Sequence, residues 1–180
     1  MKRLIALAVL ALVCVASLAW AQGPEHYNGA CGFHRIEAPV GIRWWLSDKL
    51  ALDAGLGIGS NEVANENFSH YAFDLGLPIR MKSWDRVHVL LRPGLLYESQ
   101  QVDILAGPGV NKDNDITTTF GAEIEAEVFL ADNFSVSAAH GFAISNFSPA
   151  VGGSSTDWGT TGDNFTNIGF HIYTFGGSNK

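Results

Sequence analysis

The residues of this chain that are best placed for chemistry are carboxylates spaced two apart. Glu123, Glu125 and Glu127 occupy alternate positions, so in an extended strand all three side chains point to one face. Three like charges repel one another, and burying them is tolerable only where cations face them. We therefore predict a buried ion-pair network, and the alternative is a set of solvent-facing charges on a soluble sheet. The other charged residues expected in this network are Arg43, Asp53, Asp74, Arg80, Arg92 and Glu98.

Other residues capable of chemistry carry weaker patterns. His88 and His171 fall on the same predicted face as the charges, where polar packing explains them without a metal. The run 111–115 (NKDND) has oxygen ligands at short spacing, but it lacks the Gly and the distant Glu of an EF-hand loop. The chain has no phosphate-binding loop, CxxC pair, GxSxG or HExxH motif. We expect no catalytic residue, no metal site and no cofactor.

Period-two alternation of apolar and small or polar residues predicts the strands that position these charges. Residues 50–59 (LALDAGLGIG) show it most plainly. Helical spacing fits none of the alternating segments for more than about a turn. The sequence therefore predicts an all-β protein. Its clear strands are expected at 41–46, 50–59, 70–82, 87–100, 116–130, 134–147 and 166–175.

The connections between these strands have two lengths. Three are tight, at 47–49, 83–86 and 131–133, and the alternate ones are long and polar. Short turns at one end and long loops at the other are typical of bacterial outer-membrane barrels, which have an even number of strands. On that parity we expect an eighth strand within 25–35. The long connections are expected at 60–69, 101–115 and 148–164.

The composition of the two strand faces predicts which one points outward. Leu52 and Leu56 share a face, whereas Asp53, Gly55 and Gly57 share the other. Glycine weakens a strand and is best explained where neighbours crowd in. An eight-stranded barrel has an interior just wide enough for side chains to fill it. We therefore predict an up-and-down antiparallel transmembrane barrel whose leucines face lipid and whose glycines and charges face the lumen.

The N-terminus has the form of a cleaved secretory signal. Met1-Lys2-Arg3 is basic, the following run is apolar, and Ala19-Trp20-Ala21 resembles a cleavage site. We expect a signal peptide at 1–21 and one β-barrel domain at 22–180. Removal of the signal leaves a single cysteine, Cys31, and changes the formal net charge from −7 for the full chain to −9 for the mature chain. Such a charge argues against nucleic acid as a partner.

Aromatic residues gather at two heights of the predicted barrel. One group lies near the short turns and the other near the long connections. Girdles of aromatic residues at both interfaces surround the apolar band of a membrane barrel. The residues expected in these girdles are Trp44, Trp45, Trp84, Phe129, Phe134, Tyr71 and Tyr97.

These features together resemble the small eight-stranded outer-membrane barrels of Gram-negative bacteria, the OmpA/OmpX-like group, over essentially the whole mature chain. The likeness lies in the signal ending AWA, in hairpins such as WWLSDKLALDAGLGIG and in the last strand, NIGFHIYTF. The resemblance implies a C-terminal assembly signal. The residues that match it are Asn167, Gly169, Ile172 and Phe175, although Phe175 is one residue out of step with the apolar face and five residues follow it.

The resemblance implies a non-enzymatic, monomeric barrel in the outer membrane after Sec-type export. Its expected partners are outer-membrane lipid, lipopolysaccharide and the assembly machinery. Outer-membrane lipid-A deacylases carry a His and a Ser two apart on one strand, but two residues after His140 this chain has Phe142. We expect a structural, adhesive or surface-interaction role. The alternatives are a narrow porin-like conduit and a soluble lipocalin-like carrier of an apolar ligand.

Overall fold

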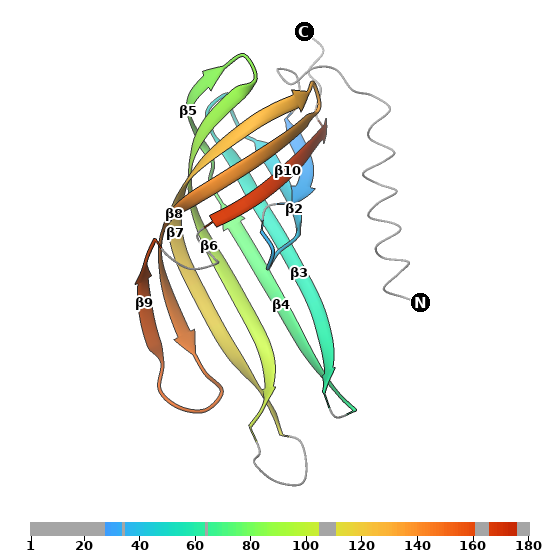
Figure 1. Ribbon diagram of the computed structural model, residues 1–180, viewed down its shortest axis with the longest axis vertical. Helices are drawn as coiled ribbons and strands as arrows, with labels where there is room; N and C mark the ends of the chain where they lie inside the picture. The colour runs from blue at the N-terminus through green and yellow to red at the C-terminus, as the bar shows by residue number, and fades with distance from the viewer. Residues whose placement is uncertain (1–27, 34, 64, 105–110, 161–165, 176–180) are drawn as a thin grey trace.

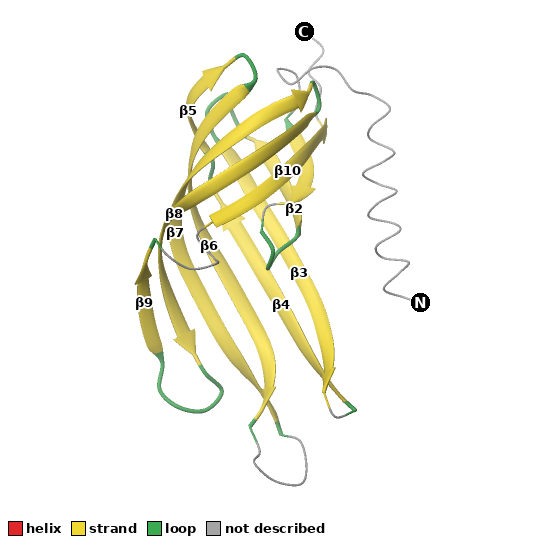
Figure 2. Ribbon diagram, viewed as in Figure 1, coloured by secondary structure: helices red, strands yellow, loops and turns green. Residues whose placement is uncertain are grey.

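The computed structural model describes residues 28–33, 35–63, 65–104, 111–160 and 166–175, which form strands joined by turns (Figure 2). The predicted signal peptide at 1–21 lies outside the described residues. No helix in the described part of the chain is long and apolar enough to cross a membrane. The strands are β1 (Gly29–Phe33), β2 (Val40–Trp45), β3 (Ala51–Val63), β4 (Glu66–Gly76), β5 (Ile79–Trp84), β6 (Val87–Asp103), β7 (Lys112–Ala131), β8 (Phe134–Ser148), β9 (Ser155–Gly159) and β10 (Thr166–Phe175).

The strands close into an antiparallel barrel (Figure 1). Strands β1 to β4, then β6, β7 and β8, lie side by side in order, and β10 pairs with both β8 and β1. Both β4 and β5 pair with β6 and are separated only by Leu77 and Pro78. In the same way, β9 and β10 both pair with β8. Counted as two interrupted strands, these pairs give eight, so the predicted all-β, eight-stranded antiparallel barrel is confirmed.

The strand predicted on parity alone is present, because β1 lies within 25–35. The three tight turns are also confirmed, and Figure 1 shows them together at the upper end of the barrel. Strands β3, β4, β6 and β7 extend well beyond β1, β2 and β10 toward the other end. The wall is therefore closed near the tight turns and open-sided toward the long connections.

The prediction of three long loops is wrong in part, because each contains strand. Within 60–69, β3 continues to Val63 and pairs with β4, which begins at Glu66. Asn65 has a φ of 68°, the left-handed conformation of a tight turn. Strands β6 and β7 likewise extend into 101–115, and β9 lies within 148–164. Most residues there are polar, so backbone pairing continues without the regular alternation that reveals a strand.

The barrel interior is layered from the tight turns toward the long connections. An apolar cluster comes first, then a layer of charged side chains, then a small cluster formed by Ala38, Ala72 and Leu96, and finally a cavity. The sequence predicted the charged layer but neither apolar cluster. The first cluster consists of Ala30, Trp45, Ala51, Leu90, Phe129 and Tyr173.

The connection between β1 and β2 enters the lumen instead of remaining outside. Ala38 is fully buried, and Arg35 reaches ion-pair partners on β4 and β7. Gly57 of β3 permits this approach, because a Cβ at that position would lie 1.8 Å from the carbonyl oxygen of Glu37. The segment 35–39 thus occupies the lumen on the long-connection side of the charged layer, and a glycine in the facing wall makes room for it.

Candidate functional site

Arg43 is at the centre of the charged layer and is fully buried. Its Nε donates to Asp53 Oδ1 at 2.8 Å and its Nη2 to Asp53 Oδ2 at 2.9 Å, the paired geometry that a guanidinium favours. The same Nη2 reaches Glu125 Oε2 at 2.8 Å, and Nη1 reaches Glu127 Oε2 at 3.3 Å. One arginine of β2 therefore links β3 to two of the three alternating glutamates of β7.

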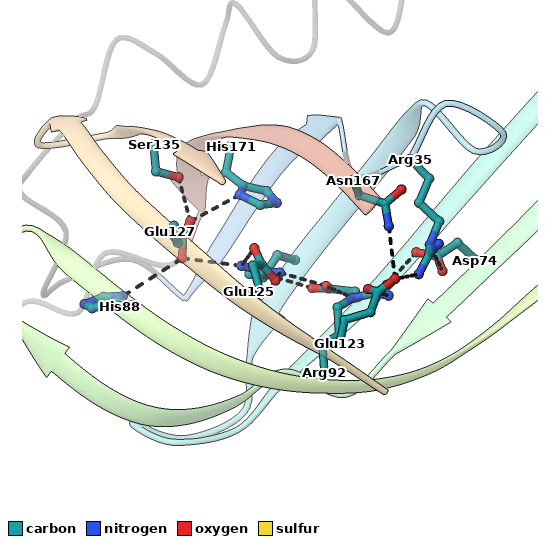
Figure 3. A network of polar contacts seen from close by, with 12 residues as sticks. Arg35, Asp74, His88, Arg92, Glu123, Glu125, Glu127, Ser135, Asn167 and His171 are labelled. Atoms are coloured by element: carbon teal, nitrogen blue, oxygen red, sulfur yellow. Dashed lines mark hydrogen bonds and ion pairs between the residues drawn. The ribbon is translucent and has the colours of Figure 1, made fainter. Parts of the chain in front are cut away.

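Arg92 of β6 continues the layer toward the long connections (Figure 3). Its Nε donates to Asp53 Oδ2 at 2.8 Å, so Asp53 bridges Arg92 and Arg43. Its Nη2 donates to Asp74, and its Nη1 lies 3.4 Å from Glu123 Oε2. Gly76 leaves space for this guanidinium, because a Cβ at that position would lie 2.4 Å from its Cζ.

Arg35 supplies a third guanidinium, which the sequence analysis did not identify. Its Nε donates to Asp74 Oδ1 at 3.1 Å and its Nη2 to Glu123 Oε1. Asn167 of β10 donates its Nδ2 to the same Glu123 oxygen at 3.0 Å. Arg35 belongs to the connection that enters the lumen, so this network depends on that connection as well as on the barrel wall.

Glu127 is the shared partner of the polar side chains nearest the tight turns. Its Oε1 accepts hydrogen bonds from Ser135 Oγ at 2.6 Å and Tyr173 Oη at 2.8 Å, and it lies 3.2 Å from His171 Nδ1. His88 Nδ1 lies 3.9 Å from Glu127 Oε2. A buried carboxylate with this many donors is well solvated by the protein. Figure 3 shows the layer as one chain of contacts from Ser135 to Asp74.

Within the described residues, this network joins three arginines to five carboxylates of β3, β4 and β7. Two small cavities in this region each have a volume of about 10 Å³, roughly enough for one water molecule. The geometry cross-links strands on opposite sides of the barrel, and buried side chains occupy this layer.

Two residues predicted for the network lie elsewhere. Arg80 places its Cζ 4.2 Å from the centre of the Trp45 ring and has no ion pair among the described residues. Glu98 lies toward the long connections, where it lines the cavity. Sequence analysis correctly placed both on the inner face but could not place them along the barrel axis. The other members it missed are Asn167, Ser135 and Tyr173, which face inward and alternate with outward-facing neighbours on β8 and β10.

Two of the predicted girdle aromatics lie inside the barrel, which corrects the prediction. Trp45 is 9% exposed and Phe129 is 5% exposed, and both belong to the apolar cluster near the tight turns. Alternation explains this, because Trp45 follows the outward-facing Trp44 directly and Phe129 shares the parity of Glu127. The predicted girdle residues that keep partial or full exposure are Trp44, Trp84, Phe134, Tyr71 and Tyr97.

The predicted assembly-signal residues divide between the faces of β10. Asn167 is buried, and Gly169 faces inward beside Ser137. Ile172 is partly exposed, and the Phe175 ring centroid lies 6.5 Å from that of the outward-facing Trp44. The pairing of β1 with β10 shifts between Gly29 and Ala30, which skips one β10 residue. This bulge brings Phe175 to the outer face despite its position in the alternation.

His140 has a hydroxyl partner that the sequence did not predict. Its Nδ1 lies 2.8 Å from Thr166 Oγ1 across the β8–β10 pair, on the exposed face. Among the described residues, no carboxylate makes an ion pair with His140, and no group of three potential metal ligands is present. In the run 111–115, Asn114 N donates to Asp113 Oδ1 at 2.8 Å, a contact between adjacent residues of β7.

Comparisons with protein-family models, with curated proteins and with solved structures found no match to this chain. The functional argument therefore rests on the residues, contacts and surfaces described above.

Proposed function

We propose that this protein is an integral β-barrel of the bacterial outer membrane with a structural, adhesive or surface-interaction role. The observation that carries the proposal is the apolar outer face of the wall. A soluble monomer rarely exposes an apolar patch of more than a few hundred Å². Here large apolar side chains face outward from strands all around the barrel. They include Ile42, Leu52, Leu56, Ile58, Phe73, Leu75, Phe120, Ile124, Phe142, Ile144, Ile168 and Phe170.

The reversal of polarity between the two faces supports the same proposal. Arg43, Asp53 and Glu127 are fully buried, whereas Ile58 is 77% exposed. In water this arrangement would leave apolar surface solvated and charges desolvated, which is unfavourable on both counts. In a bilayer, the outer face meets hydrocarbon and the lumen charges neutralise one another. A signal peptide at 1–21 and Sec-type export fit this location.

The lumen argues against the two alternatives. A lipocalin-like carrier holds its apolar ligand in the barrel interior. Here the ion-pair network occupies the middle of the lumen and leaves two cavities of about 10 Å³, and the larger cavity beyond it is lined by Glu37, Glu98 and Asp115, which does not suit an apolar ligand. A porin-like conduit needs a water-filled channel, which belongs to much wider barrels. The charged layer of Arg43, Arg92 and Arg35 fills the cross-section instead.

The polar ends of the long strands are the best candidates for contact with the surroundings. Beyond the apolar band, the β3–β4 hairpin carries Ser60, Asn61 and Glu62, and Lys112 joins Glu66 at 3.1 Å across the β4 and β7 ends. These hairpins project past the closed part of the wall (Figure 1). The proposed interaction surface is this end, and the proposed role is non-catalytic and monomeric, with lipopolysaccharide and lipid as neighbours.

Cell fractionation followed by SDS electrophoresis with and without boiling tests the proposal. Closed membrane barrels pair every strand edge, so they resist SDS until heated. We expect the mature chain in the outer-membrane fraction, with a mobility that changes on boiling. Recovery in the soluble periplasm without such a change would refute the proposal and favour a soluble barrel.

A further inference from the structure

A cavity of about 470 Å³ lies at the long-connection end of the lumen. Its floor is the β1–β2 connection, through Ile36 and Glu37, which separates the cavity from the charged layer. Its walls are the extended parts of β3, β4, β6, β7 and β8. The volume lies within the range of about 300–1,000 Å³ that is usual for small-molecule sites.

The charges that line this cavity are negative. Glu37 comes from the floor, Glu98 from β6 and Asp115 from β7, and no Lys or Arg is among the lining residues. Arg35, just before the floor, is held by Asp74 and Glu123. The cavity therefore favours a cationic occupant.

One of these carboxylates already lacks a partner. The Glu37 side chain is partly exposed, but its Oε2 is buried and has no hydrogen bond within the described residues, so an occupant of the cavity meets this oxygen once the carboxylate turns toward it. Such a buried acceptor is costly unless a donor satisfies it. Asp115 is held in place, because its Oδ1 accepts a hydrogen bond from Ala150 N at 2.8 Å. The site thus has an unsatisfied acceptor in its floor and a fixed acceptor in its wall.

The separation of the three carboxylates favours an extended cation over a single metal ion. They come from three separate elements, and no group of three potential metal ligands occurs among the described residues. A metal ion needs its ligands within about 2.6 Å, whereas a ligand with several ammonium groups can meet carboxylates that lie apart. The inward-facing Phe147 adds an apolar wall for methylene groups and a ring face for an ammonium.

We propose that this cavity binds a linear di- or polyamine, with its ammonium groups on Glu37, Glu98 and Asp115. Gln100 and Ser99, which also line the cavity, supply further oxygen acceptors. This binding site goes beyond the proposed barrel function and gives the exposed end of the barrel a small-molecule ligand.

Isothermal titration calorimetry with spermidine as the probe tests the proposal. The full mature chain is purified in an uncharged maltoside detergent, because choline headgroups would compete, and is kept at about 0.15 M salt to screen non-specific attraction. We expect saturable binding of one spermidine per chain. The Glu37→Gln/Glu98→Gln double variant should bind at least tenfold more weakly. Glu62→Gln is the matched control, because Glu62 is exposed on β3 and does not line the cavity.

Each outcome bears on the proposal. No saturable heat, equal affinity in the double variant, or displacement of spermidine by equimolar Mg²⁺ would overturn it. Folding of each variant is checked by the effect of boiling on its mobility in SDS. Should the double variant fail to fold, Glu98→Gln alone replaces it, because Glu98 makes no ion pair among the described residues. Weaker binding by that variant, with an unchanged control, would support the proposal.

Discussion

Gly57→Ala should destabilise the barrel by about 2–4 kcal/mol, although it adds one methyl group. The new Cβ would lie 1.8 Å from the carbonyl oxygen of Glu37, 2.9 Å from its carbonyl carbon and 3.3 Å from Ala38 Cα. All three are backbone atoms, so no side-chain rotation relieves the contact. The connection between β1 and β2 must then move away from the wall by more than about an ångström to reach ordinary van der Waals separation.

The magnitude follows from what this connection holds. Overpacking alone costs about 1–3 kcal/mol. Displacement also weakens the contacts of Arg35 with Asp74 and Glu123. Loss of one partner from a buried ion pair costs about 3–5 kcal/mol, but here the loss is partial, because Asp74 and Glu123 keep Arg92. The two contributions together give the range above.

Gly59→Ala is the matched control on the same strand and the same inner face. Its Cβ would meet the His70 ring at 2.1 Å, but this ring ends an exposed side chain that can rotate away. Alanine also loses less conformational entropy than glycine in a strand. We therefore expect a change in unfolding free energy within about 0.5 kcal/mol.

Urea titration of the folded fraction, followed by tryptophan fluorescence in detergent, measures both variants. A double-mutant cycle with Arg35→Met tests the mechanism, because Arg35→Met should cost less in the Gly57→Ala background if the two changes share one displacement. Equal destabilisation by Gly57→Ala and Gly59→Ala would refute the reasoning. It would mean that the β1–β2 connection does not pack against β3 inside the lumen.

Three further predictions concern the wall and its charged layer. Arg43→Met should lower the free energy of unfolding by about 3–5 kcal/mol, because it leaves several buried carboxylates uncompensated. Glu125→Gln should lower it less, because carboxylates outnumber arginines in the layer. Urea titration measures both variants, and the reverse order would contradict this charge balance. Leu56→Arg should reduce stability in lipid vesicles by about 2–4 kcal/mol if this residue faces the bilayer centre, and an unchanged folded fraction would count against that location. Tyr173→Phe should cost about 1.5–3 kcal/mol through the lost 2.8 Å hydrogen bond to Glu127, as measured by urea titration, and no change would show that the bond is not made.

The sequence predicted the barrel wall well because alternation is a local property of a strand. On β3, Leu52 and Leu56 are exposed while Asp53 is buried, in agreement with the predicted faces. The three glutamates of β7 likewise all point inward. Residue type at period two is sufficient for this result, since a shift of one residue would reverse every side chain.

The contribution of Arg35 could not be predicted in the same way. It precedes β2 in a connection with no alternation, and its buried position depends on that connection turning back into the barrel. The accommodating glycine, Gly57, is in another strand and is one of several inward glycines. Sequence reasoning explained those glycines by crowding but could not tell which neighbour approaches each one. The position of a residue along the barrel axis also could not be predicted from alternation, which is why Arg80 and Glu98 were assigned to the network.

Phe175 shows how a local irregularity limits an argument from parity. Counted along β10, it shares the inward parity of His171 and Tyr173, which are buried. The bulge opposite Gly29 adds one residue to β10 and restores Phe175 to the outer face beside Trp44. A bulge changes the phase of every residue beyond it, and no feature of the alternating pattern marks its place. An aromatic residue that is out of step near a strand end is therefore better interpreted as evidence for a bulge than as evidence for a buried ring.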